Sequence, residues 1–116
     1  MKHENLEVWS RSFKLSCLVY RSFGHIRDFG FKDQICRSGL SVPSNIAEGM
    51  ERHSSKEKAH FLSIAKGSLG ELRTQLLIAI EIQYVATDVG DKMAEECLHI
   101  SRMLGSLIVV VRGQNN

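Results

Sequence analysis

The chain has 116 residues, of which 43% are hydrophobic and 24% charged, so its composition is that of one soluble globular domain and excludes a disordered chain. The formal net charge of +2 is too small to indicate nucleic-acid binding by itself. The charge is uneven, however, because residues 1–73 hold 12 Lys and Arg against 8 Asp and Glu, whereas residues 74–116 hold 3 against 5. We expect a cytoplasmic protein with no membrane partner, because residues 1–4 do not form a signal-peptide start and the apolar run 107–111 is far shorter than the ~20 residues of a membrane span.

The spacing of apolar residues predicts four helices, at residues 6–23, 31–49, 55–85 and 91–111, joined by short turns. Four amphipathic helices bury their apolar stripes most simply as an antiparallel up-down bundle. We therefore predict an all-α fold with one four-helix-bundle domain spanning residues 1–116. The candidate N-caps are Asn5 for the first helix, Ser54 or Ser55 for the third, and Asp88 or Asp91 for the fourth, with Gly90 assisting that last turn.

Each predicted helix carries an apolar stripe that we expect to face the core. The stripe of the first helix consists of Leu6, Trp9, Phe13, Cys17 and Tyr20. The second helix uses Ile35, Val42 and Ile46 with the small Ser38 and Gly39; the third uses Phe61, Ala65, Ser68, Leu72, Leu76 and Ala79; and the fourth uses Met93, Cys97, Ile100, Leu104, Leu107 and Val111.

Three features of these helices leave alternatives open. Pro43 inside the second helix predicts a kink, or else a break into two helices. Gly67 and Gly70 lie in mid-helix at a cost of about 1 kcal/mol each relative to Ala, which indicates either another backbone at close range or loose packing. The run 107–111 is apolar on all sides, which favours a subunit contact, with a short strand as the alternative.

Chemistry-bearing residues give little support for an enzyme. Two Glu-x-x-His pairs, Glu57 with His60 and Glu96 with His99, are the spacing that di-iron bundles use on two helices. On antiparallel helices, however, these two pairs differ in height by roughly 25 Å, so they cannot share a metal within one subunit. Cys17, Cys36 and Cys97 lie in apolar segments without metal-ligand spacing, and we interpret them as buried hydrophobic residues of a reducing compartment, with a reactive thiol as the alternative. We expect no catalytic residue, metal or cofactor.

A set of polar residues lies on or beside the apolar stripes of the second and third helices. Buried polar groups need partners, so these side chains are expected to hydrogen-bond to one another or to Arg37. We interpret them as a structural network that sets helix register or subunit geometry, with a ligand site as the alternative. The set consists of Asn45, Glu48, Ser68, Glu71 and Gln75.

Basic residues are the third candidate group. If they converge in an oligomer, they form a repeated positive surface that could contact phosphates, whereas a solvated surface is the plain alternative. The nucleic-acid-binding candidates are Arg11, Lys14, Arg21, Arg37, Arg52, Lys56, Lys66 and Arg73.

Two stretches of the sequence resemble a known family. Residues 36–49 are CRSGLSVPSNIAEG and residues 65–76 are AKGSLGELRTQL. They are similar to the two signature segments of the four-helix-bundle proteins encoded within 23S rRNA intervening sequences, and the first helix matches that family's opening helix more loosely.

The resemblance implies a four-helix bundle that assembles into a ring, typically a homopentamer, without enzymatic activity. A related protein, the accessory variability protein of diversity-generating retroelements, uses a positive surface and partners a reverse transcriptase and nucleic acid. This chain departs from the family where it has Cys36 in place of an arginine, Ser38 and Gly39 in place of alanines, and Met50 and Glu51 before Arg52, which weakens the positive surface. Two functions follow: a self-assembling module that binds structured RNA or a nucleic-acid-associated protein, or a protein-protein scaffold without nucleic acid.

Overall fold

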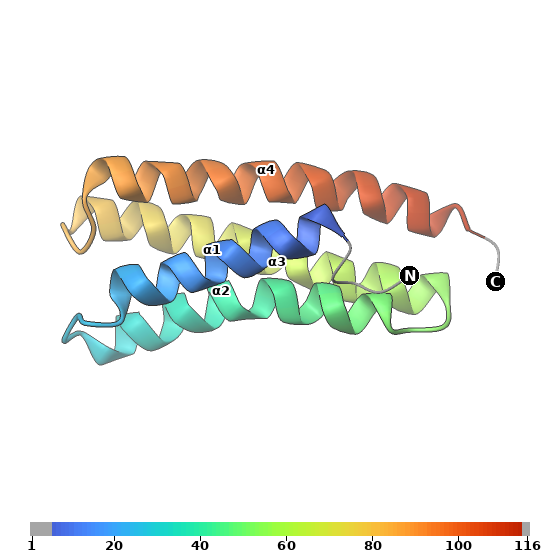
Figure 1. The fold of residues 1–116 in the computed structure, drawn as a ribbon, viewed down its shortest axis with the longest axis horizontal. Coiled ribbons are helices and arrows are strands. Elements are labelled where there is room, and N and C mark those ends of the chain that lie inside the picture. The colour runs from blue at the N-terminus through green and yellow to red at the C-terminus, as the bar shows by residue number, and fades with distance from the viewer. Residues whose placement is uncertain (1–5, 115–116) are drawn as a thin grey trace.

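The computed structural model describes residues 6–114, which form four helices: α1 (Glu7–Phe23), α2 (Phe29–Met50), α3 (Ser55–Glu81) and α4 (Thr87–Arg112). Each helix runs back along the one before it, so the four lie side by side in an elongated body (Figure 1). The prediction of an all-α four-helix bundle is confirmed, and no strand occurs within residues 6–114. None of the helices in this range is long and apolar enough to cross a membrane.

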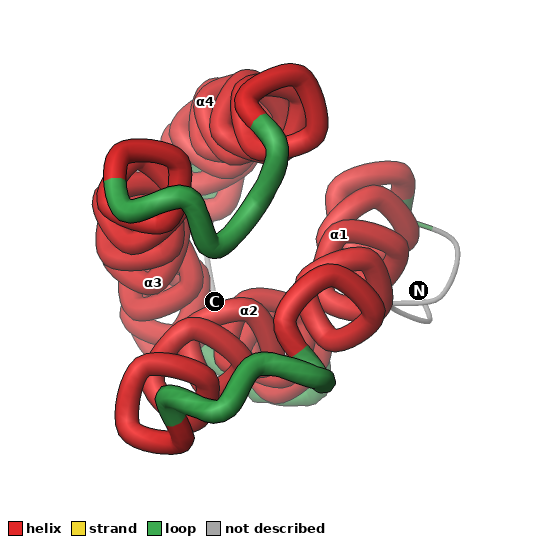
Figure 2. Tube along the Cα trace, turned by 90° about the vertical axis from the view of Figure 1, so that its left-hand side faces the viewer, coloured by secondary structure: helices red, strands yellow, loops and turns green. Residues whose placement is uncertain are grey.

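Packing between the helices is unequal around the bundle. Helix α2 packs against α1 and α3, and α3 packs against α4, whereas α1 touches α4 only lightly. Viewed along the bundle, α1 and α3 flank α2, and α4 lies diagonally across from α2 (Figure 2). The side between α1 and α4 is therefore the least closed side of the bundle.

The core is filled by the stripes predicted for the last three helices. Ile35 and Ile46 of α2, Leu72 and Leu76 of α3, and Leu104 of α4 are fully buried. Phe61 and Leu107 are the exceptions, because both are only partly buried.

The stripe predicted for α1 is wrong at Phe13 and Tyr20, which are exposed, whereas Leu6 and Trp9 are partly buried and pack against the core. The core side of α1 is formed by Val8, Leu15, Val19 and Phe23, whereas Phe13 is 49% exposed. Phe13 lies two residues before Leu15, which places it roughly 200° away around the helix. Helix α1 therefore has apolar residues on two faces, and the face with Val8, Leu15, Val19 and Phe23 is the inner one.

The starts of α2 and α4 also differ from the prediction. Helix α2 begins two residues early because the Asp28 carboxylate accepts a hydrogen bond from the Phe31 backbone N–H at 3.1 Å, which is an N-cap. Helix α4 begins at Thr87, so Gly90 lies inside the helix and not in a turn. A Cβ at Gly90 would stand 2.4 Å from Cγ1 of Ile80, so this glycine permits the close approach of α4 to α3.

The continuity of the helices excludes two of the alternatives, the break at Pro43 and the strand at residues 107–111. Helix α2 runs unbroken past Pro43, and α4 remains helical through residues 107–111, which excludes the strand. Helix α3 ends at Glu81, short of the predicted residue 85, and Gln83 takes a positive φ of 65° in the following turn. The predicted α3 cap is confirmed at Ser54, which accepts from the Glu57 backbone N–H, whereas Asn5 lies outside the described residues.

One carboxylate links the two loops at one end of the bundle. Besides capping α2 through one oxygen, Asp28 accepts a hydrogen bond from the Tyr84 hydroxyl at 2.8 Å through the other. This bond raises the pKa of Tyr84. Phe31 stacks edge-on against Tyr84, with ring centroids 5.4 Å apart, so an aromatic contact supports the same junction.

The glycines of α3 and α4 give opposite predictions for stability. A Cβ at Gly67 or Gly70 would meet nothing within 4 Å, so no other backbone of residues 6–114 comes close there. Gly67→Ala should therefore raise the free energy of unfolding by about 0.5–1 kcal/mol, because alanine restricts the unfolded chain. Gly90→Ala should lower it, because Ile80 must move. Urea unfolding of both variants measures this, and a less stable Gly67→Ala protein would contradict the open geometry.

Candidate functional site

A polar recess of about 290 Å³ lies between α2 and α3, and we call it the α2–α3 groove. Its α2 side is formed by Gln34 and by residues of the first signature stretch, 36–49. Its α3 side is formed by residues of the second signature stretch, 65–76. The lining residues are Gln34, Arg37, Ser38, Ser41, Ser68, Glu71 and Gln75.

A short hydrogen-bond chain joins the two helices at the base of this groove. The Asn45 amide donates to the Ser41 carbonyl oxygen at 2.8 Å and to the Ser41 hydroxyl at 2.9 Å. The Ser41 hydroxyl lies 2.8 Å from that of Ser68, so the two share one hydrogen. The structure thus links two members of the predicted polar network, Asn45 and Ser68, through Ser41, which the sequence did not single out. Its position four residues before Asn45 was the available signal.

Other polar atoms of the groove have no partner within residues 6–114. The Gln75 side-chain oxygen is buried without a hydrogen bond. Ser38 is only 8% exposed, and its hydroxyl forms none of the hydrogen bonds described for this range. Arg37 and Glu71 are both exposed at the groove and form no ion pair with each other. The groove therefore combines unused donors and acceptors on two rigid helices.

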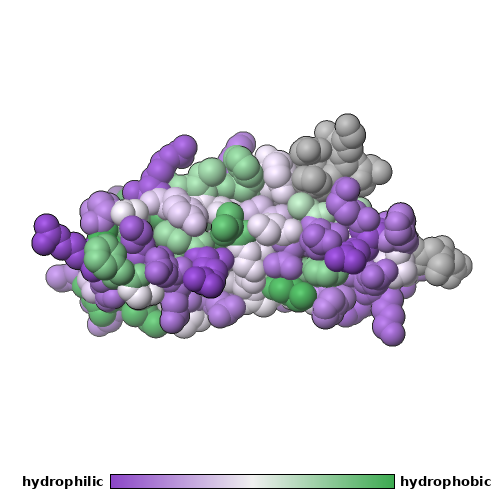
Figure 3. Space-filling view, turned by 90° about the horizontal axis from the view of Figure 1, so that it is seen from below, coloured by the Kyte–Doolittle hydropathy of each residue, from purple (hydrophilic) through white to green (hydrophobic). Residues whose placement is uncertain are grey.

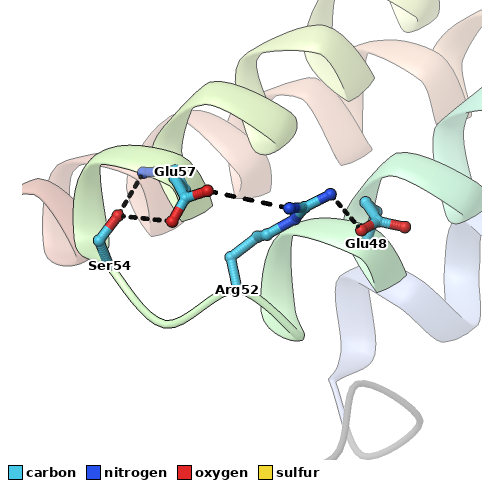
Figure 4. Close-up of polar contacts among 4 residues, drawn as sticks. All are labelled: Glu48, Arg52, Ser54 and Glu57. Atoms are coloured by element: carbon cyan, nitrogen blue, oxygen red, sulfur yellow. Dashed lines mark hydrogen bonds and ion pairs between the residues drawn. The ribbon is translucent and has the colours of Figure 1, made fainter.

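Glu48, the fifth member of the predicted network, belongs to a different cluster. The Glu48 carboxylate accepts a hydrogen bond from the Arg52 guanidinium at 2.6 Å, and the same guanidinium lies 3.8 Å from the Glu57 carboxylate (Figure 4). The Glu57 backbone N–H donates to the Ser54 hydroxyl, which caps α3. The Arg52 guanidinium stands 4.6 Å from the centre of the Phe61 ring. These contacts hold the turn between α2 and α3, so Arg52 is occupied by local partners.

The basic candidates do not converge on one surface of the subunit. Arg11 pairs with Glu96 at 2.6 Å and 2.9 Å, and this bidentate contact braces α1 against α4. Lys14 borders a recess of about 580 Å³ on the same side, together with Lys92 and Glu96. Arg21 lies beside an apolar recess and Arg37 beside the α2–α3 groove.

Three of the basic candidates follow the line where α3 meets α4, which we call the α3–α4 seam. Lys56 lines a recess of about 490 Å³ with Arg112 of α4. The Lys66 side chain reaches to within 3.6 Å of the place that a Cβ on Gly105 would take. Burial raises the pKa of the Cys97 thiol of α4, and Arg73 lies close enough to offset part of that rise. No Asp or Glu occurs in residues 58–70 or 97–112, so the seam is basic along this length.

An apolar recess of about 350 Å³ lies between α1 and α2, and we call its surroundings the α1–α2 face. Phe13 and Leu40 are each 49% exposed there, and Tyr20 is 46% exposed. Cys17 and Pro43 complete the apolar lining. Seen from the α2 side, hydrophobic groups lie at several places on the surface among hydrophilic ones (Figure 3).

Nothing in the described residues resembles a metal site. Within residues 6–114 no three His, Cys, Asp or Glu side chains lie close enough together to hold a metal ion. The two Glu-x-x-His pairs have other surroundings, because Glu96 braces α1 and His60 stacks on Phe61. All three cysteines are free, and burial raises the pKa of Cys97 to about 12 and raises that of Cys36.

These features define a small helical bundle with several distinct surfaces, and comparisons place it in a family. The family model of the 23S rRNA-intervening sequence protein matches residues 4–106, so the chain belongs to this family. A crystal structure of a protein of unknown function from the S23 ribosomal protein family of Bacteroides thetaiotaomicron has the same fold. It aligns with a TM-score of 0.82 over 87% of this chain and 97% of that chain, at 24% identity. No curated protein matches this sequence significantly.

The raised pKa of Cys97 predicts a stability loss in alkali. The folded state holds the thiol neutral up to a pH of about 12, whereas the unfolded chain loses that proton near its ordinary value of 9.0. The unfolded state therefore binds fewer protons between these values, and the free energy of unfolding should fall by up to about 1.4 kcal/mol per pH unit from this residue. Because other groups also titrate there, Cys97→Ala is the control, and it should show a shallower fall in urea unfolding between pH 9 and 11. Equal slopes would contradict the buried neutral thiol.

Proposed function

We propose that the protein is a non-enzymatic, self-assembling module whose subunits join through the α1–α2 face and whose assembly binds structured RNA. The observation that supports this most is the second apolar face of α1. Leu15 and Val19 already supply the core, so Phe13, Tyr20 and Leu40 are not needed to fill the subunit. Apolar groups gathered on one surface mark a contact site in a soluble protein.

A second copy of the chain is the occupant that this face fits best. The chain exposes another apolar stretch on α4, where Val109 is 71% and Val110 60% exposed. Helix α4 does not pack against α2, so the two apolar surfaces lie on different sides of the bundle. Contacts between two different surfaces of identical subunits repeat from head to tail and close into a ring when the rotation allows it. The family resemblance implies five subunits for such a ring.

The α3–α4 seam supports the RNA contact. Lys56, Lys66 and Arg73 follow one line, no carboxylate occurs in the stretch 58–70 between Glu57 and Glu71, and a ring repeats that line in every subunit. The open Gly67 and Gly70 stand beside Lys66 on α3, and the absence of side chains lets a phosphate backbone approach closely. Lysine and arginine on such a line gain affinity by releasing the counterions of RNA.

Assembly is tested with a matched pair of leucine variants. Leu40→Lys places a charge on the α1–α2 face, whereas Leu18→Lys places one on the other side of α1, where Leu18 is 41% exposed. Leu40→Lys should lower the assembly mass measured by native mass spectrometry, because an ammonium group is costly to bury. Leu18→Lys should leave the mass unchanged. Assembly should also slow alkylation of Cys17, which lines the same face.

An unchanged assembly mass in Leu40→Lys, with Cys17 equally reactive at low and high protein concentration, would overturn the proposed interface. A protein that stays monomeric at all concentrations would overturn self-assembly itself. A dimer in place of a ring would show that the α1–α2 face pairs with itself.

RNA binding is tested by titrating a structured hairpin at several salt concentrations. Binding should weaken steeply with salt, and Lys66→Ala should reduce the slope of log K against log salt by about 1 per subunit in contact. Lys92→Ala is the control, because Lys92 lies beside Glu95 and Glu96 on another side of α4. No hairpin binding at low salt would contradict this part of the proposal and favour the protein-protein scaffold.

A further inference from the structure

We propose that the α2–α3 groove binds a single neutral nucleobase. This inference rests on the RNA contact proposed above, and it names the part of the RNA that is recognised, an unpaired base. It stands on the polar atoms that line the groove and not on the α3–α4 seam, so it concerns a separate surface of the subunit.

The charges of the groove select a neutral ligand. Its lining contains one cation, Arg37, and one carboxylate, Glu71. A free anion would be attracted by Arg37 but repelled by Glu71. A cationic side chain would be attracted by Glu71 but repelled by Arg37. One carboxylate is also too few for a divalent cation. A group without net charge uses both residues as hydrogen-bonding partners.

The unused hydrogen-bonding atoms select a ligand with both donors and acceptors. The buried oxygen of Gln75 needs an N–H or O–H donor. On the donor side, Ser38 offers its hydroxyl. The Ser41 and Ser68 hydroxyls share one hydrogen bond, and Asn45 donates to Ser41, so one further hydroxyl hydrogen of this pair remains free to donate. Nucleobases carry donors and acceptors side by side on one planar edge, which matches this alternation.

The size and walls of the groove fit one planar group. At about 290 Å³ it lies at the lower end of the range for small-ligand sites. No aromatic ring lines it, which disfavours a sugar that would need a stacking platform. Arg37 supplies a planar guanidinium at the groove, and bases stack on such planes in single-stranded RNA complexes. The small side chains of Ser38, Ser41 and Ser68 leave this space open between two tightly packed helices.

Free nucleosides test the groove separately from the phosphate contacts, because they carry no charge. Saturation-transfer NMR would measure binding of adenosine, cytidine, guanosine and uridine to the assembled protein. At least one should bind with a dissociation constant of about 1 mM, and that value should change little with salt. Ser38→Ala, which removes only one hydroxyl, should weaken binding about twofold to tenfold, and Gln75→Leu should weaken it further.

Glu81→Gln is the matched control for Glu71→Gln, because both change an exposed glutamate of α3 and only Glu71 lines the groove. Binding should weaken in Glu71→Gln and stay unchanged in Glu81→Gln. Urea unfolding checks that each variant is folded, and Ser38→Ala remains informative if Gln75→Leu is not. The proposal is overturned if no nucleoside binds, or if Ser38→Ala, Glu71→Gln and the control bind equally.

The hairpin titration separates this outcome from failure of the RNA contact. Salt-sensitive hairpin binding without nucleoside binding removes the groove proposal alone. Nucleoside binding without any hairpin binding supports the groove and identifies a free nucleoside as its ligand. When both bind, a duplex without unpaired bases should bind more weakly than the hairpin, and Ser38→Ala should reduce that difference.

Discussion

The two-faced character of α1 is the constraint on which the rest of the structure depends. A helix in a four-helix bundle can present one side to the core, and α1 presents Leu15 and Val19. Its aromatic side, with Phe13 and Tyr20, is then left toward solvent beside Leu40 of α2. Because α1 rests mainly on α2, the bundle is stabilised chiefly by α2, α3 and α4, and the bidentate pair between Arg11 and Glu96 limits how far α1 can move from α4.

Small side chains explain why the helices pack closely and still leave usable surfaces. Gly90 lets α4 approach Ile80 of α3, and the serines at positions 38, 41 and 68 let α2 approach α3. In the first case the neighbouring side chain fills the space that glycine leaves. In the second the serine hydroxyls line a polar groove, because no neighbouring apolar group covers them. The same device, a small residue in a helix interface, therefore gives close packing at one place and a recess at another.

Periodicity predicted most of the fold, because the apolar stripes identified on α2, α3 and α4 are the ones that fill the core. It failed for α1, where two stripes of similar hydrophobicity compete and only tertiary packing selects Leu15 over Phe13. The polar residues of the groove were found because they interrupt apolar stripes, yet Ser41, which joins Asn45 to Ser68, carried no such signal. Ion pairs such as Arg11 with Glu96 join residues 85 positions apart, and no local pattern encodes them.

The surfaces of the subunit differ in chemistry and lie on different pairs of helices, so they can be occupied together. The apolar face belongs to α1 and α2, the polar groove to α2 and α3, and the basic seam to α3 and α4. If the α2–α3 groove binds one base at about 1 mM, as proposed, it would contribute little in a monomer. In the proposed ring the groove and the seam would recur in every subunit, and a single RNA that reached several of them would gain from the high effective concentration of the later contacts. Self-association would then be the condition for RNA affinity, which connects the extra apolar face of α1 to surfaces that α1 does not touch.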